Sequence, residues 1–540
     1  MSFGALSKSL ESLLRRAGGG YVHSDAVQLM PEIKATWQGR KPREHKSTTR
    51  RGPSTGVSMA ATTFAGRFAT LCCFYSFVHG VKSAAKEHCS QFPDCVKTPL
   101  LPTDPIQYAG RVPVSMPDHS VSGEMAYWLA PSTLTDPIVS PIVVVLEGGP
   151  GFPSQIQAVN GCGPYSLSED GLSVSRGAEP SWNTNVTLLF IDQPLGVGYS
   201  QAVTGQTASS ADNAVLMMQV MQMLWWGGGQ AEPALHPQLA PDATRGRPLF
   251  IFGHSYGGRT GPALAAAWLR TAPQRMRGHL SGLILGNALV DMFHQVGSIA
   301  PFLWNAGLLT NAARDSVAQT AQWVRGNVTS ANASMRAAAA DTFYSLSELY
   351  YTLKPIQFVD SYDIWCVDTG CKAKRKLGYG RFFNASAVKA SLNMPDGLPY
   401  AAFGVTALNT NADRASSSLP DLNFVLGRGV RVLVYNGVND GFLPVQGIRA
   451  ALYALNYTGV HAFRSAELRT WGRFNDPGDP FNCTFMGNVL VDDPSPGLAR
   501  LTAVGVFGAG HFANAEVLRH TRQLVLGWIQ TNSIPSPIPP

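Results

Sequence analysis

Six short apolar runs, separated by longer mixed segments, most constrain the fold of this chain. They cover residues 142–146, 186–191, 249–252, 281–285, 430–435 and 502–507. A continuous apolar run is typical of a strand that is buried on both faces, as parallel strands are in α/β proteins. A helical stretch near residues 211–226 lies between the second and third runs. The sequence therefore predicts a doubly wound, mostly parallel sheet covered by helices.

Residues of about 292–427 interrupt this alternation of strands and helices. They are helical in pattern over 337–351 and more loop-like afterwards. We expect a helical lid insertion between two strands of one α/β domain that covers residues 86–540. The basic run at 372–376 inside the insertion is either a solvated loop or a protease processing site.

The amino-terminal segment carries most of the net charge of +7. Residues 1–58 contain ten Lys or Arg and four acids, which gives +6, and the rest of the chain is nearly neutral. A nucleic-acid-binding surface is therefore not expected on the folded part. We interpret residues 1–58 as a mis-assigned start, or as a basic leader that is absent from the mature protein.

An apolar run at residues 71–81 follows Met59 and Arg67 and precedes Ser83-Ala84-Ala85. It is shorter than the ~20 residues that a membrane-spanning helix needs. A positive charge, a short apolar run and small residues are the pattern of a secretory signal, so we predict a signal peptide over residues 59–85. A buried helix or an internal anchor is the alternative interpretation.

Cysteines and sequons point to the same compartment. Six cysteines remain after signal removal, an even number that is typical of secreted proteins. Close spacing favours the pairs Cys89–Cys95 and Cys366–Cys371, and this leaves Cys162 with Cys483, which is one of about 15 possible connectivities. Predicted N-glycosylation sites are Asn327, Asn332, Asn384, Asn456 and Asn482. We expect the secretory pathway, with an extracellular or a vacuolar/lysosomal destination.

The strongest local motif is Gly253-His254-Ser255-Tyr256-Gly257. It directly follows the apolar run at 249–252 and precedes a helix of small residues at 262–267. G-x-S-x-G between a strand and a helix is typical of a nucleophile elbow, in which a strained turn presents the serine. The motif predicts Ser255 as a nucleophile.

An elbow serine needs a base and an acid, which follow it in the order Asp, then His. Asp440 comes shortly after the run at 430–435, and His511 shortly after the run at 502–507. Both would lie at carboxyl ends of strands, where α/β sheets place their ligands. His511 would accept the Ser255 proton, and Asp440 would orient the imidazole. Either residue alone could equally be an ordinary loop residue.

An oxyanion hole requires backbone N–H groups close to the nucleophile. The Tyr256 N–H is one candidate donor. The second would come from the Glu147-Gly148-Gly149-Pro150-Gly151 turn after the run at 142–146, which could also be a plain β-turn.

No metal or organic cofactor is predicted. The sequence contains no C-x-x-C, no H-E-x-x-H and no P-loop motif, which disfavours zinc hydrolases and P-loop ATPases. A serine, a histidine and an aspartate would themselves supply the nucleophile and the base.

Together these motifs resemble the serine carboxypeptidase family, whose members are secreted or vacuolar/lysosomal α/β-hydrolases. The resemblance covers roughly residues 100–530. It includes Asp192-Gln193-Pro194 in a Gly-rich segment and a weaker similarity to the family sequence at residues 361–364. The stretches that carry it are residues 147–151, 189–200, 253–258 with 262–264, 286–291, and 432–440 with 510–511.

The resemblance implies an α/β-hydrolase with a helical lid insertion that removes C-terminal amino acids through an acyl-enzyme. It implies the triad Ser255, Asp440 and His511, with Gly149 and Tyr256 as oxyanion donors. The expected substrate is the C-terminus of a peptide or protein, usually processed best in acid. No nucleic acid and no stable membrane span are expected, and a homodimer is left open.

The chain departs from the family at the residues that bind the substrate carboxylate. In the family, these residues are the Asn of Asn-Gly-Gly-Pro, the Glu before the serine and a supporting second Glu. Here the positions hold Glu147, followed by Gly148, then His254 and Gly161. Our hypothesis is that Glu147 and His254 form a swapped acid–base pair. The pair would either restore carboxylate binding or retune the enzyme to another leaving group.

Three functions follow from this sequence. A serine carboxypeptidase is the first, and an acyltransferase or esterase with the same triad is the second. The third is a catalytically weak binding protein on the same fold, against which the intact triad argues. Prolyl aminopeptidases share the Gly-Gly-Pro-Gly turn and the elbow, but Asp192-Gln193-Pro194 and the secretory signal fit them less well.

Overall fold

The computed structural model of this chain describes residues 94–96, 99–101, 104–177, 179–226, 247–352, 359–366, 378–404, 406, 408, 412–474, 483–493 and 499–533. The expected leader and signal peptide, Cys89, Cys371, Asn482 and the basic run at 372–376 lie outside these residues. All described residues belong to one compact unit, Val81–Pro540.

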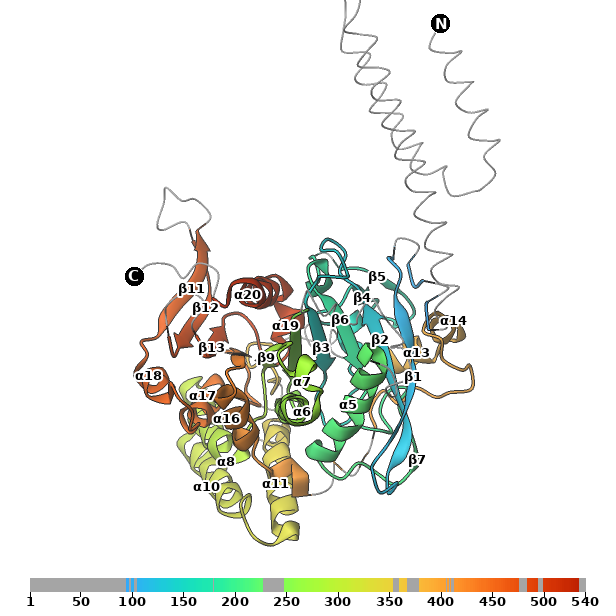
Figure 1. The fold of residues 1–540 in the computed structure, drawn as a ribbon. Helices are drawn as coiled ribbons and strands as arrows, with labels where there is room; N and C mark the ends of the chain where they lie inside the picture. The colour runs from blue at the N-terminus through green and yellow to red at the C-terminus, as the bar shows by residue number, and fades with distance from the viewer. Residues whose placement is uncertain are drawn as a thin grey trace, which may run out of the picture. The chain divides into compact units, whose positions relative to one another are not determined.

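Six neighbouring strands run parallel at the centre of the main sheet (Figure 1). They coincide with the six apolar runs to within two residues at each end, which confirms the predicted parallel sheet. In their order across the sheet they are β6 (Thr187–Ile191), β3 (Ile142–Leu146), β8 (Leu249–His254), β9 (Leu280–Gly286), β10 (Arg431–Gly437) and β13 (Leu501–Val506).

Antiparallel strands extend this sheet on both sides, so that the described residues give it 11 strands. These strands were not predicted from the sequence. They are β1 (Tyr108–Ser115), β2 (Ser122–Ala130) and β7 (Gln201–Thr204) beside β6, and β12 (Cys483–Val491) and β11 (Arg469–Phe474) beside β13. A separate hairpin joins β4 (Tyr165–Leu167) to β5 (Val174–Arg176).

Helices cover both faces of the sheet, as a doubly wound fold requires. Alternate residues of β3 enter different cores, Val144 in one and Val143 in the other. The first face packs against α5 (Ser210–Trp226), α6 (Gly257–Thr271), α16 (Leu419–Gly427), α17 (Val445–Tyr453) and α18 (Val460–Ser465). The second packs against α4 (Ile156–Val159), α13 (Tyr379–Asn384), α14 (Ser386–Ser391), α19 (Ala513–Glu516) and α20 (Leu518–Thr531).

A helical insertion follows β9 and precedes β10, two strands that pair directly in the sheet. Its first helices form a third core that also includes Tyr256 and Phe442, which flank the predicted nucleophile and acid. These helices are α8 (Met292–Gln295), α9 (Ile299–Asn305), α10 (Asn311–Asn327) and α11 (Ala333–Thr352). A short helix, α7 (Gln274–Arg277), and three 3-10 turns (Trp182–Thr184, Val296–Ser298, Ala412–Ala415) complete the described elements.

One predicted disulfide is wrong. Cys162 is a buried free thiol that packs beside Glu147, whose charge and the burial together raise the pKa of that thiol. Cys95 and Cys366 are disulfide-bonded. The residues expected to pair with them lie outside the described ones, so those pairings stay predictions.

The asparagines of the described sequons differ in their exposure to solvent. Asn332, Asn384 and Asn456 are exposed, and Asn327 is half-buried. Their glycosylation stays a prediction. A search of the described residues for a helix with the length and apolar character to span a membrane finds none.

Candidate active site

The predicted nucleophile occupies the turn between β8 and α6. Ser255 has φ +57°, a left-handed conformation that is strained for a residue with a side chain. Hydrogen bonds from the Ser255 N–H to the Gly286 carbonyl, and from the Leu289 N–H to the Ser255 carbonyl, hold this conformation. The predicted elbow is therefore present, and it directs the half-buried hydroxyl away from the core.

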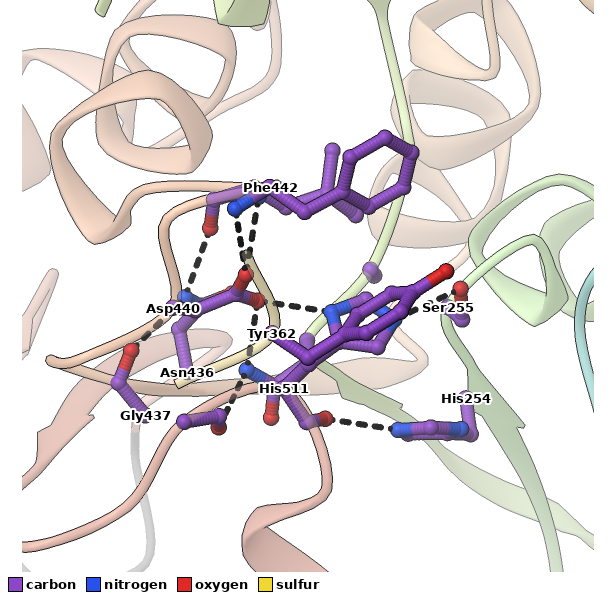
Figure 2. Close-up of polar contacts among 12 residues, drawn as sticks. His254, Ser255, Tyr362, Asn436, Gly437, Asp440, Phe442 and His511 are labelled. Carbon is purple, nitrogen blue, oxygen red and sulfur yellow. Dashed lines mark hydrogen bonds and ion pairs between the residues drawn. The ribbon is translucent and has the colours of Figure 1, made fainter. Parts of the chain in front are cut away.

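The structure brings the three predicted triad residues together, although more than 250 residues separate the first from the last (Figure 2). The Ser255 Oγ lies 2.9 Å from His511 Nε2, and His511 Nδ1 lies 2.8 Å from Asp440 Oδ2. Asp440 and His511 are buried. In this geometry Nδ1–H donates to the carboxylate, and Nε2 can accept the serine proton.

The Asp440 carboxylate is held by four donors. Oδ1 accepts the backbone N–H groups of Phe442 and Leu443, at 3.0 and 2.9 Å. Oδ2 accepts from His511 and, at 2.9 Å, from the side-chain amide of Asn287. Because these donors engage both carboxylate oxygens, Asp440 is oriented toward the imidazole with a fixed geometry.

Aromatic side chains enclose the imidazole of His511. The Tyr362 ring lies across it with 5.1 Å between ring centroids, and the Phe442 ring meets it edge-on at 5.8 Å (Figure 2). The Tyr362 carbonyl also accepts the His511 backbone N–H at 2.6 Å. These contacts fix both the backbone and the ring of His511 and reduce the access of water to the triad.

The Gly-rich turn after β3 approaches the elbow closely. A Cβ on Gly148 would lie 2.5 Å from the Tyr256 nitrogen and 2.6 Å from the Ser255 Cβ, so only glycine fits there. Within the described residues, neither the Gly149 N–H nor the Tyr256 N–H donates a hydrogen bond. Tyr256 directly follows Ser255, and Gly149 directly follows the glycine that contacts the elbow, and their role as oxyanion donors stays a prediction.

We predict that Gly148→Ala lowers kcat/KM by about 10²-fold, because displacing reacting groups by about 1 Å has such an effect. The new methyl group would push the turn away from Tyr256 and separate the two oxyanion donors. The matched control is Gly326→Ala in α10, where a Cβ meets nothing within 4 Å. Steady-state kinetics test the prediction, and a Gly148→Ala enzyme as active as the control would contradict it.

The two residues that depart from the family pattern form a buried ion pair. His254 Nδ1 lies 2.6 Å from Glu147 Oε1, and the side chains are 0% and 4% exposed. His254 Nε2 lies 2.9 Å from the His511 carbonyl, which can only accept, so Nε2 carries a proton. The charge of His254 lowers the pKa of Glu147 despite its burial, and Glu147 raises the pKa of His254. The swapped acid–base pair is therefore a feature of the site.

Further donors saturate the Glu147 carboxylate. The Gly148 N–H donates to Oε1 at 2.9 Å, and the Gln157 side-chain amide donates to Oε2. A Cβ on Gly161 would lie 1.9 Å from Gln157 Oε1, so the glycine leaves room for that amide. The Asn514 amide donates to Gln157 Oε1 from α19, the short helix that follows His511.

Three positioning residues were not assigned a role from the sequence. Asn287 links Asp440 to the Gly510 carbonyl from a turn with φ +45°. Gln157 holds Glu147, and Tyr362 packs on His511. The stretches around Asn287 and Tyr362 already resembled the family, and that was the available signal. No pattern in the sequence pointed to Gln157.

Comparisons with known proteins agree on one family. A family model described as serine carboxypeptidase matches residues 100–531. Serine carboxypeptidase-like 50 of Arabidopsis thaliana is 27% identical over 80% of this chain and 89% of its own length. Serine carboxypeptidase S10 family member 1 of Dictyostelium discoideum is 23% identical over 75% and 90%.

A solved structure shows the same fold. The Kex1(delta)p prohormone-processing carboxypeptidase of Saccharomyces cerevisiae aligns with a TM-score of 0.62 and 20% identity. The alignment covers 79% of this chain and 92% of that one. The predicted α/β-hydrolase fold is therefore confirmed. Because the family model spans most of the chain, the protein is a member of the serine carboxypeptidase family.

Proposed function

We propose that this chain is a serine hydrolase that acts through an acyl-enzyme on Ser255. The observation that carries the proposal is the continuous chain of contacts Ser255 Oγ–His511–Asp440 beside two available N–H groups. As the Oγ–C bond forms, the Oγ proton moves to His511 Nε2, and His511 then passes it to the leaving group as the acyl–leaving-group bond breaks. Water deacylates the enzyme by the reverse proton path.

The leading candidate activity is the release of C-terminal amino acids from peptides. Membership of the serine carboxypeptidase family supports it, as does the fold shared with the Kex1 carboxypeptidase. The relatives named serine carboxypeptidase-like are only 23–27% identical to this chain. The substrate must therefore be determined by experiment on this chain itself.

The test is a mass-spectrometric time course with unblocked peptides at mildly acidic and neutral pH, beside labelling with a fluorophosphonate. We expect the label on Ser255 and a ladder of peptides shortened from the C-terminus, because an acyl-enzyme forms and is hydrolysed. Labelling without any shortened peptide would exclude the peptidase and leave the hydrolase. Absence of both labelling and cleavage would contradict the proposed mechanism.

Ester cleavage or acyl transfer is the second candidate function. One observation favours it: Glu147, at a position that the family resemblance assigns to carboxylate binding, is itself a carboxylate paired with His254. An acyl acceptor other than water would attack the same acyl-Ser255, so the triad serves this chemistry equally well.

We further propose a secretory location, either extracellular or vacuolar/lysosomal. The support is chemical: Cys95 and Cys366 are disulfide-bonded, and disulfides persist in oxidising compartments. Glycosylation at the predicted sequons and removal of the signal peptide are part of the same proposal.

A further inference from the structure

The buried carboxylate of Glu147 accepts the hydrogen bonds of the donor groups that lie beside the nucleophile Ser255. Glu147 Oε1 accepts from the Gly148 N–H and faces the Nδ1 of His254, while Oε2 accepts from Gln157. These groups lie next to the elbow, because His254 directly precedes Ser255 and Gly148 packs against it. The donors that could hold an anion at this point therefore already hold one.

The cation of this cluster is equally unavailable to a substrate. His254 can offer two N–H groups, of which one meets Glu147 and the other donates to the His511 carbonyl. Its side chain is 0% exposed, so no substrate atom can reach the ring without rearrangement of the elbow. The pair carries no net charge, whether the shared proton lies on His254 or on Glu147.

The surrounding contacts keep the cluster in this state. Gln157 is fixed by Asn514 and fits only because residue 161 is a glycine. The Glu147 carbonyl accepts the side-chain amide of Gln193, which fastens the backbone of the turn. Moving Glu147 aside to admit a substrate carboxylate would leave several buried donors without partners, which is costly.

We infer that the Glu147–His254 pair replaces a carboxylate-binding subsite and that the enzyme takes acyl compounds whose group beside the scissile bond is uncharged. This inference rests on the proposed acyl-enzyme chemistry of Ser255, and of the two candidate activities it favours ester cleavage or acyl transfer over the release of C-terminal amino acids. Peptide amides, peptide esters and simple esters belong to that class. A free C-terminal carboxylate gains no hydrogen bond from these groups and no net charge to attract it, because the charges of Glu147 and His254 compensate each other.

The test compares kcat/KM for one N-blocked dipeptide as its free acid, its amide and its methyl ester. We expect the free acid to be cleaved no faster than the amide. A subsite that gripped the carboxylate would favour the free acid by about 10- to 100-fold, since hydrogen bonds to charged groups have that effect. A preference of tenfold or more would overturn the inference.

A double variant, Glu147→Asn with His254→Glu, introduces the family residues at both positions. We expect it to raise the free-acid-to-amide ratio by about tenfold, most clearly at acidic pH, where the new Glu is protonated. Glu124→Gln is the matched control, because Glu124 lies on β2, next to the edge strand β1, in an ion pair with Arg111. An unchanged ratio in a folded double variant would contradict the inference.

Two failures remain distinguishable. If Ser255 reacts with a fluorophosphonate and the wild-type enzyme prefers the free acid, the inference fails and the proposed hydrolase stands. If Ser255 does not react and no substrate is cleaved, the proposed function fails and the inference falls with it. The wild-type ratio decides the question even where the double variant does not fold.

Discussion

Replacing Ser255 with alanine is expected to lower kcat by about 10⁶-fold, the order of loss that follows removal of a serine nucleophile. The hydroxyl is the group that forms the covalent bond to the acyl carbon, and it lies 2.9 Å from His511 Nε2, its expected base. The fluorophosphonate label should disappear with the activity. Initial rates and intact-protein mass spectrometry measure both effects.

The control for this substitution is Ser120→Ala, an exposed serine that contacts Asp118 in the turn after β1. It removes the same hydroxyl group far from the triad in the sequence and should leave the rate and the label unchanged. Ser255→Ala should still fold, since the methyl group of alanine is tolerated by the same elbow. Residual activity above about a hundredth of wild type would contradict a covalent role for Ser255, because binding and oxyanion donors alone retain far less.

The central fold was predictable because its strands are buried on both faces. The sequence of β3 is apolar at all five positions, and the same holds for most of β6 and β8. Among the antiparallel strands, β1 and β7 were not predictable in the same way. Strand β7 is exposed throughout, and β1 mixes buried and exposed positions around Arg111 and Pro113, so neither has a distinctive apolar run.

The triad was predictable because its order along the chain and its positions after strands follow from the fold class. The network around it was not. Gln157 and Asn514 lie 357 residues apart, and their contact exists only because the short helices α4 and α19 meet on the same face of the sheet. The same limit explains the wrong disulfide: counting cysteines assumes that each one is oxidised, whereas Cys162 is enclosed beside Glu147 and free.

Asp440→Asn is expected to lower kcat by about 10⁴-fold at neutral pH, because the imidazole is left in the wrong tautomer. The two backbone N–H groups of Phe442 and Leu443 would hold the amide oxygen. The amide NH₂ would then face His511 Nδ1, which must become an acceptor, so the ring proton moves to Nε2. A protonated Nε2 cannot take the proton of Ser255.

The substitution also brings two hydrogen-bond donors into contact, because the new NH₂ would face the side-chain NH₂ of Asn287, which now donates to Asp440. Some loss of thermal stability is therefore expected, and activity alone would not separate orientation from folding. The rate of fluorophosphonate labelling does separate them, because it reports on the base that activates Ser255 in protein that remains folded.

Asp421→Asn is the matched control, because this half-buried carboxylate on α16 pairs with Arg270 at 3.3 Å. It removes the same charge without touching the triad and should change neither the labelling rate nor kcat. A folded Asp440→Asn enzyme that labels as fast as this control would mean that His511 is oriented without Asp440. The enclosure of the imidazole by Tyr362 and Phe442 would then be the contact that sets its geometry.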